Sequence, residues 1–350
     1  MSNVQDIERN IEFEFVRATE NAALNAIPWL GRGKKEIADE AACDAINGVF
    51  DLVDIRGEVV IGEGIKDKAP GIFLGDKLGK GRKDSPRFDI ALDPIDGTTN
   101  IAKGLPNAIS VMAAAYVPEG NSHGMLNIPS FYAEKLSYGP IVKEAIVQTK
   151  IPPLEMGMDF AEIMTHAATA LRKRVSQLVV VALDRPRNQN YIDTVRSQGA
   201  ALRLISDGDI AAAVAPALPD SGVDLYIGIG GSPEGILTAA ALKALGGEIY
   251  LRMWPRDAEE RLELLGTVGE QDLDRVYSTG ELVVGESALF CATGISDSPL
   301  LPGVKLVGNT AITHSILMRA RSQTVRYIRA VHNLSSKTIH LRSTKREATV

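Results

Sequence analysis

The sequence predicts an α/β protein with two domains, on three observations. Two helical stretches open the chain and are followed by separate apolar runs of strand length. Beyond residue 159, similar apolar runs alternate with amphipathic stretches, which is the pattern of an α/β layer. Two adjacent prolines lie within residues 148–158, where the pattern changes. We therefore predict domains over residues 1–155 and 156–350.

The first domain is predicted to begin with two helices. Apolar residues recur at helical spacing over Val4–Ile27 and stop before Pro28, and Lys34–Phe50 follows as a second helix. Asp39 lies in this second helix and, from this segment alone, is an ordinary solvated carboxylate. Strands are predicted at Glu58–Ile61, Phe88–Leu92, Ile109–Val117 and Gly124–Ile128.

The stretch Asp89–Asn100, D-I-A-L-D-P-I-D-G-T-T-N, carries the strongest chemical signal in the chain. Asp93 follows an apolar strand, and Pro94 is predicted to end that strand because proline has no N–H to donate. Asp96 points back toward the same space, and Gly97 allows a tight turn and a close approach to a ligand. Two threonines add hydroxyls. This combination favours a divalent cation beside a phosphate over the alternative, an acidic turn with an Asx-type hydrogen bond.

Two further segments of the first domain are candidates for ligand binding. Gly62-Glu63-Gly64 follows a strand, and the flanking glycines leave room for a ligand at a carboxylate presented by the strand end. Asp67 follows on a polar loop. Ser130–Gly139 mixes aromatic and charged residues, which is typical either of a solvated edge or of a lid over a sugar.

In the second domain, strands and helices alternate. A helix after Gly230 has Pro233 and Glu234 in its first turn, where proline is tolerated and a carboxylate is stabilised by the helix dipole. The polar, basic tail after Ser335 is predicted to fray. The other helices are predicted at Phe160–Val175, Gln189–Gln198 and Ile210–Ala217, and the strands at Gln177–Leu183, Ala201–Ile205, Asp224–Ile229 and Ser287–Thr293.

Three charged loops follow strands of this second domain: Asp184–Arg187, Asp207–Asp209 and Gly230–Gly235. Ligands of open α/β sheets bind outside the carboxyl ends of strands. An Arg-Pro-Arg sequence held by its proline is well suited to bind a phosphate through its guanidinium groups. Each loop alone is typical of an ordinary surface loop, but together they favour a phosphorylated substrate.

The composition argues against several classes of partner. The formal charge of −6 and the 5% of aromatic residues argue against nucleic-acid binding. The longest apolar runs are far shorter than a membrane span, and no signal peptide is predicted at Met1–Asn10. The two cysteines, Cys43 and Cys291, are predicted to be small buried hydrophobes in a cytoplasmic protein. The five histidines lack zinc-site spacing.

Six motifs, in order along the chain, carry a family resemblance. They are V-V-I-G-E-G at 59–64, D-P-I-D-G-T at 93–98, F-Y-A-E-K-L at 131–136, D-R-P-R at 184–187, L-I-S-D-G-D at 204–209 and G-I-G-G-S-P-E-G at 228–235. Together they resemble class II fructose-1,6-bisphosphatases (the GlpX type), within the lithium-sensitive sugar and inositol phosphatase superfamily. The resemblance covers nearly the whole chain.

The resemblance implies a layered α-β-α-β-α sugar-phosphatase fold, with an α+β half that carries metals and an α/β half that binds substrate. The implied reaction is hydrolysis of the 1-phosphate of fructose 1,6-bisphosphate to fructose 6-phosphate and phosphate, a step of gluconeogenesis. It implies two or three Mn²⁺ or Mg²⁺ ions at each site. It also implies a homo-oligomer, either a dimer or a tetramer.

Site residues carry over from the family by position. The implied metal ligands are Asp39, Glu63, Asp93, Asp96 and Glu234. The implied substrate-binding residues are Asp96, Gly97, Thr98, Tyr132, Arg185, Pro186, Arg187, Asp207, Gly208, Asp209 and Gly231. Thr98, Asp67 and Lys35 match positions tied to catalysis. In this scheme the Thr98 hydroxyl, hydrogen-bonded to Asp39 or Asp67, orients the attacking water.

The sequence departs from the family pattern at three positions. Asp96 stands where glutamate is usual, Ile65 where an acidic residue is common, and Asn188 where histidine is common after D-x-P-R.

Three alternatives to this function remain. A dual enzyme of the Calvin-cycle type also hydrolyses sedoheptulose 1,7-bisphosphate. The D-P-I-D-G-T-T-N run favours an inositol-monophosphatase-like activity, although a mono-ester gives Arg185 and Arg187 no second phosphate to bind. A catalytically silent sugar-phosphate sensor is the non-enzymatic alternative, and the intact carboxylates argue against it.

Overall fold

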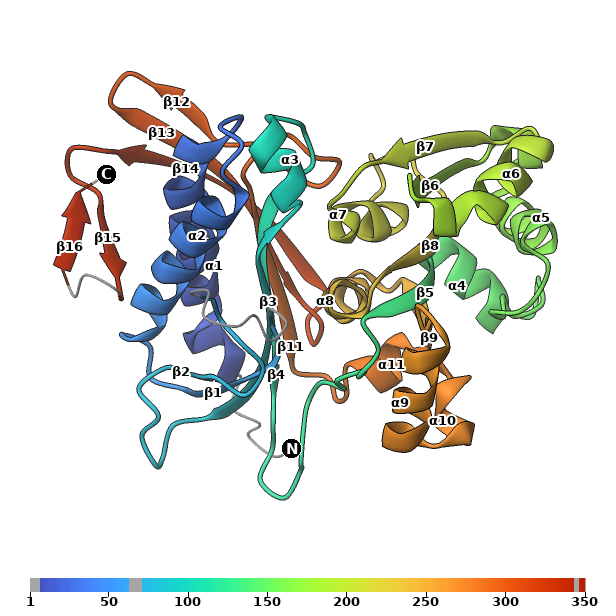
Figure 1. Ribbon diagram of the computed structural model, residues 1–350, viewed down its shortest axis with the longest axis horizontal. Coiled ribbons are helices and arrows are strands. Elements are labelled where there is room, and N and C mark those ends of the chain that lie inside the picture. Colours follow the sequence, from blue (N-terminus) through green and yellow to red (C-terminus); the bar gives the residue numbers. More distant parts are fainter. Residues whose placement is uncertain (1–6, 63–70, 343–345, 350) are drawn as a thin grey trace. The chain divides into compact units, whose positions relative to one another are not determined.

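A computed structural model describes residues 7–62, 71–342 and 346–349 (Figure 1). The chain forms two compact units. Unit 1 comprises Met1–Leu126 and Val283–Val350, and unit 2 comprises Asn127–Leu282. Each unit contains a mixed β-sheet with helices, which confirms the predicted α/β class.

Unit 1 is built on a sheet ordered β12-β13-β11-β4-β3-β1-β2, with β14 also paired to β13. The described strands are β1 (Arg56–Ile61), β2 (Lys77–Leu78), β3 (Arg87–Asp96), β4 (Ile109–Tyr116), β11 (Ala288–Gly294), β12 (Lys305–Val307), β13 (Thr310–Arg319) and β14 (Thr324–Asn333). The helices are α1 (Glu12–Ala26), α2 (Lys35–Phe50) and α3 (Thr98–Lys103), with short 3₁₀ helices at Ile7–Asn10 and Ile27–Trp29. A separate hairpin pairs β15 (Thr338–Leu341) with β16 (Arg346–Thr349).

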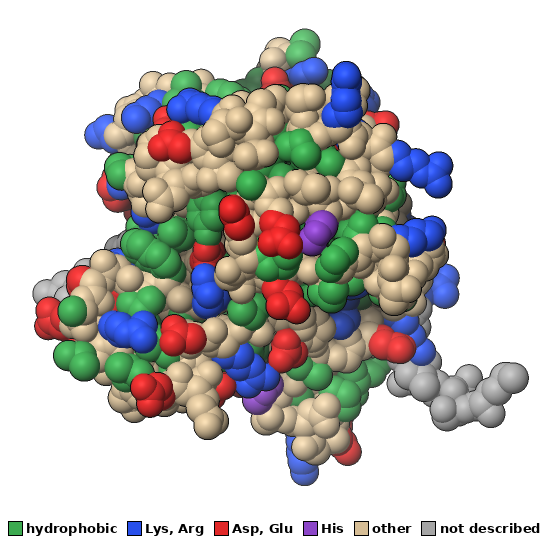
Figure 2. Space-filling view, turned by 90° about the vertical axis from the view of Figure 1, so that its right-hand side faces the viewer, with side chains coloured by type: hydrophobic (Ala, Val, Ile, Leu, Met, Phe, Trp, Pro, Cys, Tyr) green, Lys and Arg blue, Asp and Glu red, His purple; other side chains and the backbone are tan. Residues whose placement is uncertain are grey.

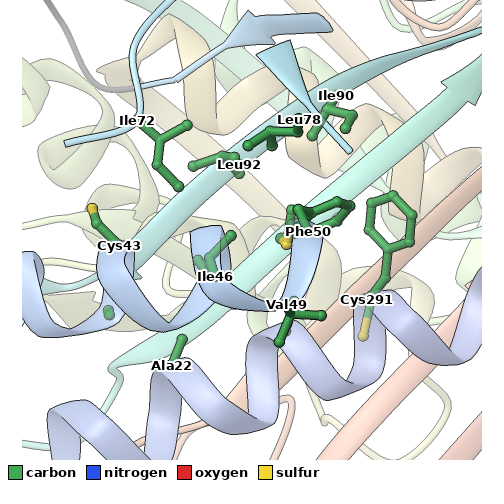
Figure 3. Close-up of a cluster of buried hydrophobic side chains, with 14 of the residues drawn as sticks. Ala22, Cys43, Ile46, Val49, Phe50, Ile72, Leu78, Ile90, Leu92 and Cys291 are labelled. Carbon is green, nitrogen blue, oxygen red and sulfur yellow. The ribbon is translucent and has the colours of Figure 1, made fainter. Parts of the chain in front are cut away.

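Helices α1 and α2 pack on the sheet and form the core of unit 1 (Figure 3). Fully buried small residues such as Ala22 allow the two helices to approach closely, and the rings of Phe15 and Phe50 meet edge to face at 5.1 Å. Cys43 and Cys291 are buried in this core and form no disulfide within the described residues, which confirms their prediction as buried small hydrophobes. Burial raises the pKa of the Cys291 thiol to about 12.

A buried chain of hydroxyl groups fixes α1 to strands that come much later in the sequence. The Thr293 hydroxyl of β11 donates to the Thr19 hydroxyl of α1 at 2.8 Å. A second contact of 2.8 Å joins Thr293 to the Ser315 hydroxyl of β13. All three side chains are fully buried, and the Thr19 hydroxyl also donates to the Val16 carbonyl of its own helix at 3.1 Å, so these buried hydroxyl groups have hydrogen-bond partners within the protein.

The C-terminal hairpin packs on α2, so the prediction that the tail frays is wrong for β15. Ile339 is buried and packs with Leu24 and Ala45. At Gly48 of α2, a Cβ atom would lie 1.8 Å from the His340 carbonyl oxygen, so the helix accepts no side chain at this point of contact. Leu341 packs against the same cluster, and Arg342 pairs with Asp51 at the C-terminal end of α2 at 2.6 Å, so apolar and ionic contacts together hold the tail here.

Unit 2 is built on a sheet ordered β10-β9-β5-β8-β6-β7. The described strands are β5 (Tyr132–Tyr138), β6 (Val179–Leu183), β7 (Ala201–Ile205), β8 (Leu225–Gly231), β9 (Glu248–Met253) and β10 (Val276–Ser278). The helices are α4 (Pro140–Val147), α5 (Phe160–Leu171), α6 (Gln189–Ser197), α7 (Asp209–Val214), α8 (Ser232–Leu245), α9 (Ala258–Val268), α10 (Glu270–Leu273) and α11 (Thr279–Leu282), with 3₁₀ turns at Val175–Gln177, Pro186–Asn188 and Ala215–Ala217.

Alternate residues along the strands of unit 2 face two different helical layers. Val180 and Ile227 join the cluster formed with α4, α5 and α6, whereas Val181 and Tyr226 join the cluster formed with α7. The sheet is therefore buried on both faces by helices. This arrangement is the α/β layer that the alternating pattern predicts.

The interpretation of Ser130–Gly139 as a solvated edge or a lid is wrong for Ala133–Tyr138. Strand β5 lies inside the sheet between β8 and β9, and Ala133–Tyr138 is buried. Its charged side chains have partners: Glu134 accepts hydrogen bonds from Arg252 and Tyr191. Charged residues are tolerated in a buried strand when they are paired in this way.

The units do not divide at the predicted boundary of 155/156. Strand β5 belongs to unit 2 because it pairs with β8 and β9. The chain beyond residue 282 returns to unit 1 because β11 pairs with β4 and β13. The prolines at 152 and 153 mark a change of local pattern, whereas the units are defined by pairing between strands that are distant in sequence.

No helix within the described residues has the length and apolar composition needed to cross a membrane. On the face of the molecule shown in Figure 2, acidic and basic side chains are interspersed among polar and apolar ones. That face therefore lacks the continuous basic stripe typical of proteins that bind a nucleic-acid backbone.

Candidate active site

The acidic stretch of unit 1 lies at the end of β3. This strand continues to Asp96, so the prediction that Pro94 ends it is wrong. Asp93 pairs with Val111 and Asp96 pairs with Ile109 of β4, which leaves two residues of β3 opposite one of β4. Pro94 lies in this bulge, where its missing N–H interrupts no regular ladder bond. Asp93 is half-buried and Asp96 is buried.

A sharp turn follows β3. Gly97 has φ of 96°, in the left-handed region, and a Cβ atom there would lie 2.5 Å from the Asn107 carbonyl oxygen. Glycine is therefore required here both by the backbone conformation and because a side chain would clash with the Asn107 carbonyl oxygen. Helix α3 begins directly after it, at the half-buried Thr98.

The start of α2 is held close to α3. Two backbone N–H groups in the loop 31–33 donate to carbonyl oxygens of α3 at 2.8 and 2.9 Å. Lys35 is the first residue of α2 and is exposed, and Asp39 is half-buried one turn later. Glu63 and Asp67, a predicted ligand and a predicted catalytic residue, lie outside the described residues.

In unit 2, the three predicted loops share one edge of the sheet. Strand β6 pairs in parallel with both β7 and β8, so the loops that follow these strands meet at their carboxyl ends. The side chain of Asn188 joins two of these strands: its amide nitrogen donates to the Leu183 carbonyl at 3.0 Å, and its oxygen accepts from the Ile229 N–H at 2.7 Å. Asn188 thus has a structural role here.

Arg187 and Tyr132 come together at this edge. The Arg187 guanidinium lies 4.2 Å from the centre of the Tyr132 ring, and its Nε–H donates to the Ile229 carbonyl at 2.9 Å. Both side chains are half-buried. Of the other residues predicted for these loops, Arg185 and Asp207 are half-buried, Pro186 is exposed and Gly208 is buried.

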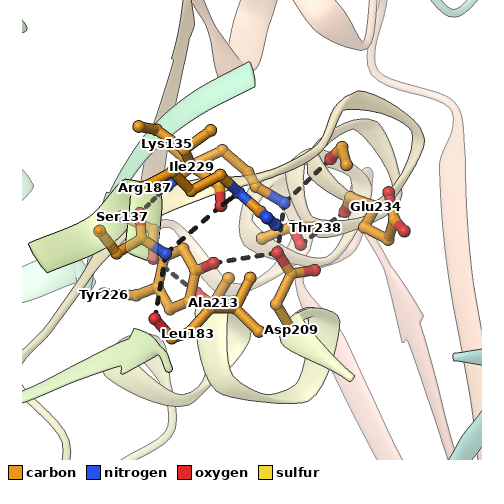
Figure 4. A network of polar contacts seen from close by, with 12 residues as sticks. Lys135, Ser137, Leu183, Arg187, Asp209, Ala213, Tyr226, Ile229, Glu234 and Thr238 are labelled. Atoms are coloured by element: carbon orange, nitrogen blue, oxygen red, sulfur yellow. Dashed lines mark hydrogen bonds and ion pairs between the residues drawn. The ribbon is translucent and has the colours of Figure 1, made fainter. Parts of the chain in front are cut away.

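A buried polar network links Asp209 to Gly231 (Figure 4). Lys135 Nζ lies 2.6 Å from Asp209 Oδ2 and donates to the Gly231 carbonyl oxygen at 2.9 Å. The Tyr226 hydroxyl donates to the same Asp209 oxygen at 2.9 Å. Sequence reasoning missed Lys135 and Tyr226, although a lysine inside an apolar strand is a signal that a buried anion lies nearby.

Glu234, in the first turn of α8, sits against Gly231. A Cβ atom on Gly231 would lie 1.9 Å from Glu234 Oε2. This oxygen is buried and has no hydrogen-bond partner among the described residues. Burial, and then the negative charge of Asp209, raise the pKa of the Glu234 carboxyl group, which the charge of Lys135 partly opposes. A buried carboxylate oxygen without a donor suits a cation ligand.

Within the part of the chain that the structure describes, no three His, Cys, Asp or Glu side chains are grouped so as to hold a metal ion. Glu63, which is one of the five predicted ligands, is not among these residues. The metal set implied by the resemblance therefore stays a prediction, supported by the unpartnered oxygen of Glu234.

Comparison with known proteins places the chain in a family. The family model described as "Bacterial fructose-1,6-bisphosphatase, glpX-encoded" matches residues 9–332. The chain is 38% identical over 342 residues to the protein of Escherichia coli (strain K12) named fructose-1,6-bisphosphatase 1 class 2, across 95% of this chain and 97% of that protein. The fructose-1,6-bisphosphatase class 2 of Shigella flexneri shows the same identity and coverage. The motif resemblance is thus confirmed, and the chain belongs to the bacterial, glpX-encoded fructose-1,6-bisphosphatase family.

Proposed function

We propose that this protein hydrolyses the 1-phosphate of fructose 1,6-bisphosphate and releases fructose 6-phosphate and phosphate. The observation that carries the proposal is the family membership over residues 9–332, which includes every motif that supplies a candidate site residue. The geometry of unit 2 supports it, because loops with arginine, aspartate and glycine residues share one sheet edge.

The proposal assigns the sugar phosphate to unit 2. The Nε–H of Arg187 is engaged by the Ile229 carbonyl, which orients the guanidinium. Its terminal nitrogens and those of Arg185 would then bind the distal phosphate, where arginine forms two parallel hydrogen bonds. Asp207 and Asp209 would accept hydrogen bonds from sugar hydroxyls. This second phosphate is what favours a bisphosphate over an inositol mono-ester.

The proposal also assigns divalent cations, Mg²⁺ or Mn²⁺, to Asp39, Glu63, Asp93, Asp96 and Glu234. Such cations supply positive charge against phosphoryl oxygens and activate water. Thr98 would hold the attacking water through its hydroxyl, and the backbone N–H groups at Gly97 and Thr98 would receive phosphate oxygens. The left-handed turn at Gly97 supports this role, since it exposes backbone at a point without a side chain.

The test is phosphate release by metal-stripped protein, before and after Mg²⁺ or Mn²⁺ is restored. Three substrates are compared: fructose 1,6-bisphosphate, sedoheptulose 1,7-bisphosphate and inositol 1-phosphate. We expect release from the first substrate only when a metal is present, because phosphoryl transfer depends on charge neutralisation. Comparable rates on both bisphosphates would establish a dual enzyme. Release from inositol 1-phosphate alone, or from none of the three, would overturn the proposal.

Replacing Thr98 by alanine tests the water-orienting role. We expect Thr98→Ala to lower kcat by roughly 100-fold while KM stays within about threefold, since the hydroxyl acts in the transition state. Thr99→Ala is the matched control, because Thr99 is the next residue of the same helix and is also half-buried. Steady-state kinetics of the two variants are compared with wild type. A Thr98→Ala enzyme with normal turnover would remove Thr98 from the scheme.

A further inference from the structure

Lys135 is a fully buried cation in the middle of β5. A buried ammonium group is costly unless a carboxylate and further hydrogen bonds compensate for its lost hydration. The contacts of the Lys135 side chain must therefore account for its burial. Its Nζ atom contacts Asp209 and the Gly231 carbonyl within the network of Figure 4.

These contacts join two loops of the candidate site. Asp209 is the first residue of α7, and Gly231 is the residue that precedes α8. Lys135 reaches both, at 2.6 and 2.9 Å. Strand β8 leaves room for this crosslink at Gly230, where a Cβ atom would lie 2.2 Å from Asp209 Oδ2 and 2.9 Å from Lys135 Nζ.

The network also selects one oxygen of the Asp209 carboxylate. Lys135 and the Tyr226 hydroxyl both contact Oδ2, at 2.6 and 2.9 Å. Two donors on the same oxygen fix the rotation of the carboxylate. A sugar hydroxyl that donates to the other oxygen, Oδ1, would then meet it in one defined orientation.

We propose that Lys135 is a positioning residue for the substrate site of unit 2. By crosslinking Asp209 to Gly231, it fixes both substrate-binding loops and orients the Asp209 carboxylate toward a sugar hydroxyl. The inference rests on the proposed function, because it assumes that these loops bind the sugar phosphate. It adds a residue that contacts no substrate and acts through Asp209.

The chain contains a matched control lysine. Lys143 of α4 makes the same two kinds of contact in the same unit: an ion pair with Glu248 at 2.9 Å and a hydrogen bond to the Gly247 carbonyl at 3.0 Å. Neither partner belongs to the predicted site. The Lys143 side chain is 37% exposed, against 1% for Lys135, so Lys143→Met controls for the loss of these kinds of contact outside the substrate loops.

The experiment compares fructose 1,6-bisphosphate hydrolysis by wild type, Lys135→Met and Lys143→Met, with circular dichroism to confirm folding. We expect Lys135→Met to raise KM at least about tenfold and to change kcat less than about threefold, because positioning of a ground-state contact affects binding. Lys143→Met should keep both constants. Normal KM in folded Lys135→Met would overturn the inference.

A double-mutant cycle shows whether Lys135 acts through Asp209. Asp209→Asn should raise KM at least about tenfold, and Lys135→Met/Asp209→Asn should stay within about twofold of it, since paired residues are not additive. The double variant removes both buried charges together. It therefore still tests whether Lys135 acts through Asp209 if Lys135→Met alone does not fold. A normal KM in the double variant, or a further tenfold rise over Asp209→Asn, would overturn the inference.

The two proposals fail in different ways. Inactive wild-type protein would overturn the proposed function and, with it, the role of Lys135. Active wild type with unchanged constants in folded Lys135→Met would overturn the role of Lys135 alone.

Discussion

Replacing Asp96 by asparagine is expected to remove most of the phosphatase activity without unfolding the protein. The amide has the shape of the carboxylate but lacks its charge, so it binds a divalent cation poorly. We expect kcat to fall by roughly 10²- to 10³-fold, the range seen when one group that stabilises transition-state charge is lost. Steady-state phosphate release at saturating metal measures this. A variant that keeps wild-type turnover would remove Asp96 from the proposed metal ligands.

The control for this prediction lies on the same strand. Asp89 is also buried, and its Oδ2 accepts from the backbone N–H groups of Gly124 and Met125 at 2.6 and 3.2 Å. Asp89→Asn places an amide nitrogen in this buried site and is expected to lower the free energy of unfolding by about 1–3 kcal/mol. Its kcat should remain near that of wild type, which separates the loss of a structural carboxylate from the loss of a functional one.

Replacing Gly231 by alanine is also expected to reduce the activity strongly. The new Cβ atom would lie 1.9 Å from Glu234 Oε2, whereas ordinary contact begins at 3.4 Å, so the carboxylate must move. Displacement of a site group by about 1 Å can cost roughly 100-fold in rate, and we expect a fall of this size in kcat/KM. Kinetics on fructose 1,6-bisphosphate measure it.

Gly266→Ala is the control for the glycine substitution. Gly266 lies inside α9, and nothing lies within 4 Å of the position of its Cβ atom. Alanine is favoured over glycine in a helix interior, so this variant should gain about 0.5–1 kcal/mol of stability and keep its activity. Equal loss of activity in both variants would mean that the Glu234 contact is not the cause.

The parallel strands of unit 2 could be predicted because each has a clear signal in its own local sequence. Gln177–Leu183 and Ala201–Ile205 are short apolar runs that end in polar turns, and the structure has β6 and β7 there. Their loops lie at one edge because parallel strands point the same way. In such a layer, the local sequence pattern that identifies the strands also predicts that the loops after them lie at the same edge of the sheet.

Strand β5 could not be predicted because its partners are remote. Lys135 is neutralised by Asp209, which is 74 positions away, and Glu134 by Arg252, which is 118 positions away. Without those partners, a strand that contains Glu-Lys indicates an exposed edge. The same limit applies to the site: the three loops could be found from their motifs, but the lysine that joins two of them could not.

The bulge at Pro94 shows a different limit. Proline normally ends a ladder, and that rule placed the end of the strand at Leu92, four residues before the observed end of β3 at Asp96. Between Asp93 and Asp96, β3 has two residues opposite one residue of β4. Pro94 lies in this bulge, so the pairing with β4 resumes after it. The sequence of one strand alone does not show the register in which it pairs with its neighbour.

The discontinuity of unit 1 has a consequence for how the protein is made. During synthesis the chain emerges from the ribosome in order, and domains generally fold as units when their residues are available. Unit 2 is continuous and is complete at Leu282, but Thr19 of α1 meets its partner Thr293 only 274 positions later. The part of α1 that packs on β11 and β13 therefore lacks these partners while unit 2 is translated, whereas α2 and β4, which also contact α1, are already made. The earliest residues of the nascent chain are the ones exposed longest to chaperones and proteases.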